Sequence, residues 1–150
     1  MVLASHILAG AVVAVKIQNP AIGLPLAFLS HFLLDALPHS EYSIKGLAEP
    51  GSKNFPRSAG KVLVDFSLGL GLAVFAAPSD INFLYLAGAI ILAVLPDFFQ
   101  LLTFLNTRWL RKFNRWHCDV VHIKPKPQKV WGWIFQILFS AGLLAILIWR

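Results

Sequence analysis

The sequence predicts an all-α integral membrane protein, with one polytopic domain over residues 1–150. We expect five transmembrane helices and one amphipathic helix in the membrane interface. Hydrophobic residues make up 57% of the chain and charged residues 13%, roughly half the charged share of a soluble globular protein. Five apolar segments, at about 1–17, 20–38, 61–77, 81–105 and 130–149, set the number of spans, because crossing a bilayer takes roughly 20 apolar residues.

The segments are joined alternately by short and long connections. The first segment lacks a basic leader and a small-residue cleavage site, so we expect a retained helix. Lys16, Asn19 and Pro20 make a tight turn after it, and Pro78 to Asp80 separate the third segment from the fourth. The connections at about 39–60 and 106–129 are long, polar and basic.

The basic residues predict the orientation. Five spans place both long connections on the side of the N-terminus, with every Lys and Arg except Lys16 and Arg150. The positive-inside rule therefore predicts an inner (cytoplasmic) membrane protein with its N-terminus in the cytoplasm and its C-terminus outside. Topology also accounts for the net charge of +6, so we expect membrane lipid, and not nucleic acid, as the surroundings of these charges.

The stretch RWLRKFNRWHCDVVH, residues 108–122, predicts the interfacial helix. Aromatic residues occupy one face and basic residues the rest, as in helices that lie on a membrane surface. The helix either anchors the chain to anionic lipids or delivers histidines to a site, where arginines would grip an anionic substrate. The histidines are His117 and His122, and the arginines are Arg108, Arg111 and Arg115.

Ionisable residues continue stripes of small residues spaced four apart. The stretch SHFLLDALPH, residues 30–39, has His31, Asp35 and His39 at this spacing. Residues four apart share a helix face, and small residues mark faces where membrane helices pack closely. The stripes therefore predict that the ionisable groups face inward at one depth. The four stripes are His6-Gly10-Ala14, Gly23-Ala27-His31-Asp35-His39, Asp65-Gly69-Ala73-Ala77 and Ala89-Ala93-Asp97.

Histidines and aspartates together are the ligand set of a divalent transition metal. We expect one or two ions, with zinc the first candidate and manganese or iron the alternatives. The expected metal ligands are His6, His31, Asp35 and Asp97, followed by His117 and His122. Asp65 and His39 are expected as catalytic groups, or as ligands of a second ion that Asp35 would share with the first.

Three elements of the chain resemble the membrane-bound metal-dependent hydrolases of bacterial inner membranes and archaea. That family has an early histidine, a Leu-Pro-Asp-x-Asp-His element and a later His-Arg-Gly-x-Thr-His element. Here His6, Leu95-Pro96-Asp97 and the His-x4-His spacing of His117 and His122 are similar to them. Phe98, Phe99 and Gln100 stand where the family has its second Asp and His, and Cys118-Asp119 replaces Arg-Gly. The resemblance implies a metal-dependent hydrolase.

The first functional hypothesis is hydrolysis of an ester or phosphoester, with a lipid of the cytoplasmic leaflet as substrate. The alternatives are a transporter for metal ions or protons, since ionisable residues in spans often mark ion pathways, and a noncatalytic scaffold with a structural metal. Glycine-rich faces could pack within one chain or between chains, so a homo-oligomer is a possible assembly.

Overall fold

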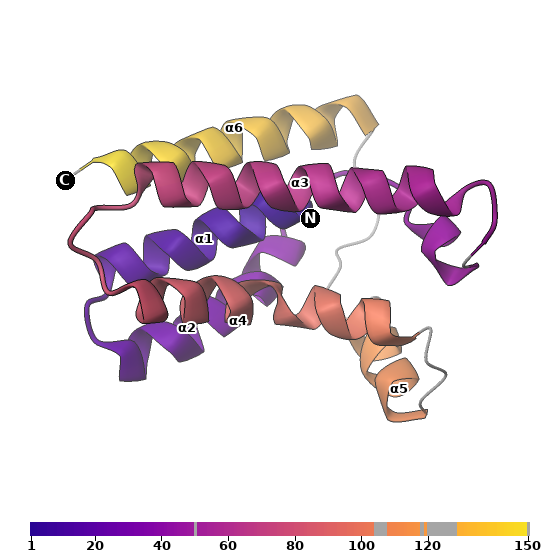
Figure 1. Ribbon diagram of the computed structural model, residues 1–150, viewed down its shortest axis with the longest axis horizontal. Coiled ribbons are helices and arrows are strands. Elements are labelled where there is room, and N and C mark those ends of the chain that lie inside the picture. Colours follow the sequence, from indigo (N-terminus) through magenta and orange to yellow (C-terminus); the bar gives the residue numbers. More distant parts are fainter. Residues whose placement is uncertain (50, 104–107, 118, 120–128, 150) are drawn as a thin grey trace.

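The chain forms a helical bundle, seen in the computed structural model of Figure 1. The structure describes residues 1–49, 51–103, 108–117, 119 and 129–149. Over these residues the predicted all-α fold is confirmed. The elements are α1 (Leu3–Lys16), α2 (Pro20–Asp35), the short 3-10 helix η1 (Lys45–Ala48), α3 (Phe55–Ala76), α4 (Phe83–Leu102), α5 (Arg108–Trp116) and α6 (Lys129–Ile148).

Among the described residues, three helices are long and apolar enough to cross a membrane: α3, α4 and α6. The other two predicted spans are shorter, since α1 has 14 residues and α2 has 16. At 1.5 Å per residue they extend about 21 and 24 Å, less than the roughly 30 Å of a bilayer core. That all five helices cross the membrane therefore stays a prediction.

Helix α1 is the centre of the bundle. In Figure 1 it runs between α3 and α6 on one side and α2 and α4 on the other, and it packs against all four. Small residues permit this packing: a Cβ at Gly10 would lie 2.8 Å from the carbonyl oxygen of Ala89, so only glycine fits. Because protein and not lipid surrounds α1, the bilayer thickness does not set its length.

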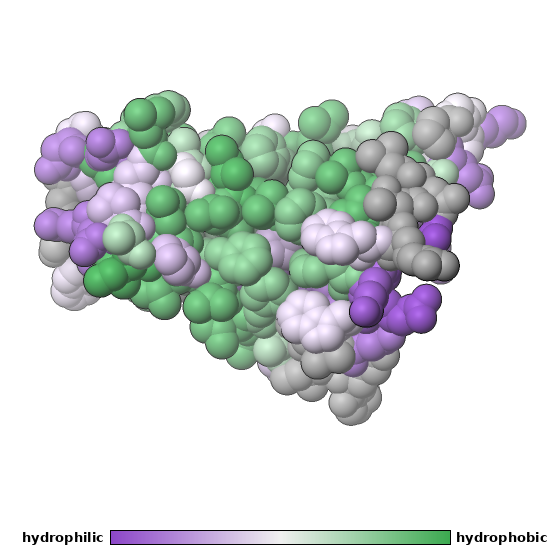
Figure 2. All heavy atoms as spheres, turned by 90° about the horizontal axis from the view of Figure 1, so that it is seen from below, coloured by the Kyte–Doolittle hydropathy of each residue, from purple (hydrophilic) through white to green (hydrophobic). Residues whose placement is uncertain are grey.

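Burial confirms the predicted inward stripes except at Asp65, Ala77 and Asp97, which are half-buried. Ala14, Ala27, Ala73, Ala89 and Ala93 are all buried, as are His6, His31, Asp35 and His39. The opposite faces carry exposed large apolar side chains, as expected for helices that face lipid. Figure 2 shows the result on one side of the molecule, where an apolar band lies between more polar ends.

The two ends of the bundle differ. We call the end with the turns 17–19 and 77–82 the turn end, and the end with η1 and α5 the loop end (Figure 1). The described parts of both long connections lie at the loop end, as the predicted topology requires. At the turn end, the Lys16 ammonium donates a hydrogen bond to the carbonyl of Trp149 and so ties α1 to α6.

Asparagine side chains begin two of the helices. Asn19 Oδ1 accepts from the amide of Ala21 at the start of α2, and Asn82 Oδ1 accepts from the amide of Tyr85 in α4, which satisfies amides that have no partner within the helix. Helix α3 starts at Phe55, six residues before the predicted segment at 61. Pro56 favours this earlier start. The basic residues of the first turns lower the local hydropathy, so the apolar segment in the sequence begins later than the helix.

Candidate metal centre

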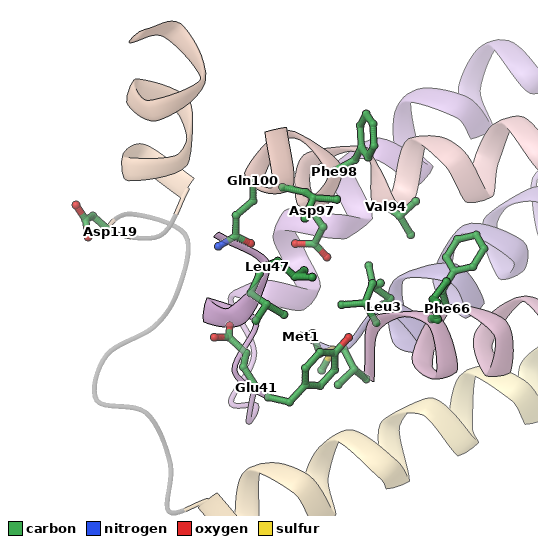
Figure 3. Close-up of a pocket in the computed structure, with 16 residues that line it drawn as sticks. Met1, Leu3, Glu41, Leu47, Phe66, Val94, Asp97, Phe98, Gln100 and Asp119 are labelled. Atoms are coloured by element: carbon green, nitrogen blue, oxygen red, sulfur yellow. The ribbon is translucent and has the colours of Figure 1, made fainter. Parts of the chain in front are cut away.

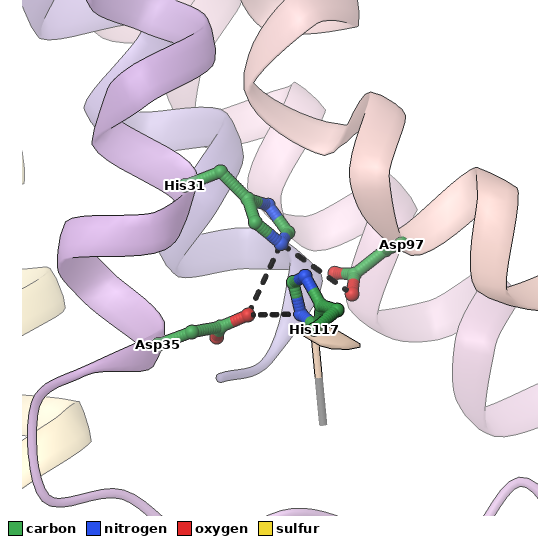
Figure 4. A group of neighbouring side chains, drawn as sticks. All are labelled: His31, Asp35, Asp97 and His117. Atoms are coloured by element: carbon green, nitrogen blue, oxygen red, sulfur yellow. Dashed lines mark hydrogen bonds and ion pairs between the residues drawn. The ribbon is translucent and has the colours of Figure 1, made fainter. Parts of the chain in front are cut away.

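Helix α2 supplies the core of a buried polar group at the loop end. His31 and Asp35 lie one turn apart on the same face, and their Nε2 and Oδ2 atoms are 3.0 Å apart. Both side chains are almost completely buried. Figure 4 shows these two residues with Asp97 and His117, all four directed toward one another from three separate segments.

The His31 ring is held in one orientation. Its Nδ1 lies 2.8 Å from the carbonyl oxygen of Ala93 in α4. This bond makes Nδ1 the donor and leaves Nε2 as an acceptor facing the group, where it has no hydrogen-bond partner. Histidines that bind metals commonly use their second nitrogen on a backbone carbonyl in this way.

Helix α4 supplies Asp97, directly after the buried Pro96. Its Oδ1 lies 3.8 Å from His31 Nε2, and its side chain keeps 21% of its exposure. Asp97 is therefore the member of the group that is open to its surroundings.

His117 reaches the group because aromatic residues fix the segment before it. Trp116 packs edge-on against Phe32 of α2, and Phe113 packs edge-on against Phe99 of α4. His117 follows directly and is 2% exposed, with its Nε2 3.0 Å from Asp35 Oδ2. The aromatic face of α5 thus packs partly on the bundle and delivers a histidine, which was one of the two predicted roles of this segment.

His6 of α1 completes the surroundings of the two aspartates. Its Nε2 lies 3.2 Å from Asp35 Oδ1 and 3.9 Å from Asp97 Oδ2. The ring stacks on His31 with 4.1 Å between centroids. His6 is completely buried, and neither ring nitrogen has a hydrogen-bond partner. A buried polar atom without a partner is costly, which a bound cation would relieve.

The group fits a divalent transition metal. His31, Asp35, Asp97 and His117 each offer a ligand atom, and these four atoms all lie within 4.8 Å of one another. Imidazole nitrogens and carboxylate oxygens are ligands of zinc, manganese and iron. A buried group of two histidines and two aspartates that could hold a metal ion is therefore present. Which metal it would hold stays a prediction.

Asp65 is not part of this group, and its carboxylate is hydrogen-bonded to other residues. Its oxygens accept hydrogen bonds from the backbone amides of Leu3 and Ala4, at 2.8 and 3.1 Å, and from the Tyr42 hydroxyl at 2.9 Å. Asp65 thus caps α1 from the neighbouring helix. Burial of Tyr42, and next the charge of Asp65, raise the pKa of the tyrosine hydroxyl. A catalytic role of Asp65 stays a prediction, and these contacts favour a structural one.

Of the remaining predicted residues that the structure describes, His39 is not part of the group. His39 is buried, but its Nδ1 lies 2.7 Å from the carbonyl of Leu37 and its Nε2 lies 3.0 Å from Glu41. Arg111 and Arg115 are exposed on α5, and their substrate-binding role stays a prediction. His122 and the side chain of Arg108 lie outside the described residues.

Two residues near the group were not predicted from the sequence. The amino group of Met1 contacts Asp35 Oδ1, and Tyr42 lines the cavity described next. Neither continues a stripe of small residues in a helix, which was the signal that identified the other residues. The lone tyrosine in an otherwise polar connection was the only available hint.

A cavity of about 500 Å³ opens beside Asp97 (Figure 3). The first residues of the chain, α3, α4 and the connection before η1 form its walls, with Asp119 at its rim. Most of the lining is apolar, including Leu3, Leu47, Phe66 and Val94. The polar members besides Asp97 are Glu41, Tyr42, Gln100 and Asp119. Asp97 thus connects the group of possible metal ligands to a cavity of the size of a small-molecule site.

Comparison of the chain with protein-family models, with curated proteins and with solved structures gives no match.

Proposed function

We propose that the protein is a membrane-embedded, metal-dependent hydrolase that cuts an ester or phosphoester bond of a lipid in the cytoplasmic leaflet. The main support for this proposal is that Asp97 occurs in two features of the structure. It belongs to the buried group of possible metal ligands, and it also lines the adjoining cavity. A substrate in the cavity would therefore meet the metal at this residue. The resemblance of His6, Asp97 and His117 to the hydrolase elements points to the same reaction.

The chemistry follows from the ligands. A divalent ion at His31, Asp35, Asp97 and His117 would polarise the scissile group and lower the pKa of a water molecule to near neutrality. The chain itself fixes the donors: the Ala93 carbonyl orients His31, and Asp35 lies between His31 and His117 at 3.0 Å from each. Asp97 has the most open carboxylate of the group, so it is the one that would lie beside the bond to be cut.

A lipid substrate is supported by the walls of the cavity. Leu63 and Phe66 of α3 and Phe98 of α4 line it, yet they are 64%, 38% and 51% exposed. Helices α3 and α4 both pack against α1 but make little contact with each other. An acyl chain could therefore enter sideways between these helices from the membrane and leave its polar linkage at the depth of Asp97.

The transporter alternative lacks a continuing path. Between the metal-binding group and the turn end, the described helices carry no ionisable side chain until Lys16. Small and apolar residues fill the bundle there, including Gly10, Ala14 and Ala27. Ion transport requires polar groups along the whole path, so hydrolysis explains the one-sided group better.

The test is an assay of the purified protein in nanodiscs loaded with Zn²⁺, Mn²⁺ or Fe²⁺. Phospholipids and chromogenic carboxylic and phosphate esters serve as substrates. We expect metal-dependent release of product that chelation abolishes, that Asp97→Asn reduces at least tenfold, and that Asp80→Asn leaves unchanged. Asp80 is a matched control because it is an exposed carboxylate at the turn end. Metal binding without hydrolysis of any ester, or equal activity of Asp97→Asn, would contradict the proposal.

A further inference from the structure

His6 lies outside the compact set of ligand atoms although it contacts the same carboxylates. The four donors that all lie within 4.8 Å of one another belong to His31, Asp35, Asp97 and His117, and His6 is not among them. Donors bound to one ion at about 2.1 Å can be at most about 4.2 Å apart. His6 is therefore poorly placed to share an ion with all four of the others.

The two aspartates divide their oxygens between two directions. Asp35 turns Oδ2 toward His31 and His117, at 3.0 Å from each, and its Oδ1 lies 3.2 Å from His6. Asp97 divides in the same way, with Oδ1 at 3.8 Å from His31 and Oδ2 at 3.9 Å from His6. Each carboxylate thus offers one oxygen to the His31 side and one to the His6 side.

Bridging carboxylates with separate histidines on each side are suited to a pair of ions about 3.5–4 Å apart, as in two-metal hydrolytic sites. The His6 side has a donor that needs a partner, because the ring is completely buried and its Nε2 accepts no hydrogen bond. The Met1 amino group also contacts Asp35 Oδ1. A metal ion there would compete with this positive charge for the oxygen.

We propose that a second divalent cation binds between His6 Nε2, Asp35 Oδ1 and Asp97 Oδ2, so that Asp35 and Asp97 bridge two ions. His6 then takes the place on the second ion that the sequence spacing had suggested for His39. This inference rests on the metal-binding part of the proposed function and not on which bond is cut. It assigns His6 to the second ion alone, and His31 and His117 to the first.

The test is the metal content of the untagged full-length protein in detergent after dialysis against Zn²⁺, measured by mass spectrometry. We expect two ions per chain in the unaltered protein and in Asp80→Asn, and one ion in His6→Gln. One ion in the unaltered protein, or two in His6→Gln, would overturn the second site and leave the proposed function standing. No bound ion would overturn both.

A second measurement does not depend on the folding of a variant. The unaltered protein is loaded with Mn²⁺ and its electron paramagnetic resonance spectrum is recorded. Two ions bridged by carboxylates are exchange-coupled, so we expect the spectrum of a coupled pair at saturation. The spectrum of isolated Mn²⁺ ions at saturation would overturn the proposal.

Discussion

The same three helices, α1, α2 and α4, build two very different halves of the bundle. Toward the turn end they meet through small residues, and the Tyr85 hydroxyl donates to the carbonyl of Ile17. Toward the loop end the same helices bury His6, His31 and Asp35. Tight helix packing therefore does not need ionisable groups in this protein.

The two halves differ in the free-energy cost of their buried side chains. A charged residue costs about 2.5–3.5 kcal/mol at the centre of a membrane helix on insertion scales and less toward the helix ends, whereas polar contacts between membrane helices return only about 0.6 kcal/mol on average. The apolar half avoids this cost, so the polar half is not explained by stability. We propose that ligand binding explains it, and four substitutions test the contrast between the halves.

The largest expected effect is at Asp35, which contacts His6, His31 and His117. Asp35→Asn removes a charge and a bridging ligand, so we expect metal affinity to fall by more than about 100-fold, beyond the usual effect of residues behind the ligands. Zn²⁺ titration of the protein in detergent measures this. Affinity within threefold of the unaltered protein would mean that the polar half does not bind metal.

The next effect is expected in the packing of α1 on α4. Gly10→Val places a side chain 2.8 Å from the Ala89 carbonyl oxygen, and such overpacking typically costs about 1–3 kcal/mol. We expect a lower midpoint of thermal unfolding in detergent. Gly71→Ala is the control, because a Cβ at Gly71 meets no atom within 4 Å. Equal midpoints for the two variants would contradict the tight packing of α1.

Asp65 tests the link between the fold and the site. Asp65→Asn weakens the cap on the amides of Leu3 and Ala4, and loss of a helix cap costs about 1 kcal/mol. We expect a modest loss of thermal stability and less than a tenfold loss of metal affinity. Loss of metal binding as complete as in Asp35→Asn would instead make Asp65 a ligand.

The smallest effect is expected at His39. Its two ring nitrogens already contact the Leu37 carbonyl and the Glu41 carboxylate. His39→Gln should therefore leave the number of bound ions and their affinity unchanged. The same Zn²⁺ titration measures both. If the substitution removes an ion, the sequence-based prediction of His39 as a ligand is right and the assignment of His6 to that position is wrong.

The sequence predicted the parts of the site that depend on helix periodicity. The spacing of His6, His31, Asp35 and Asp97 with small residues predicted that they face inward at a common depth, and the structure brings them together. The spacing did not separate His39 from this set. Pro38 ends the regular helix before it, and the chain turns so that His39 meets Glu41.

Contacts with the backbone could not be predicted in this way. Asp65 continues a stripe as the other aspartates do, but its partners are amides at the start of another helix. The position of His117 depends on aromatic packing between α5 and both α2 and α4. Such contacts depend on how the helices are arranged in space, which the periodicity of a single helix does not contain.

X-ray absorption spectroscopy of the zinc-loaded protein tests most directly whether the buried histidines and aspartates bind a divalent metal ion. We predict nitrogen and oxygen ligands at about 2.0–2.2 Å, together with the outer-shell scattering of imidazole rings, and loss of this signal in Asp35→Asn but not in Asp80→Asn. A spectrum of hydrated zinc without imidazole scattering would contradict the account.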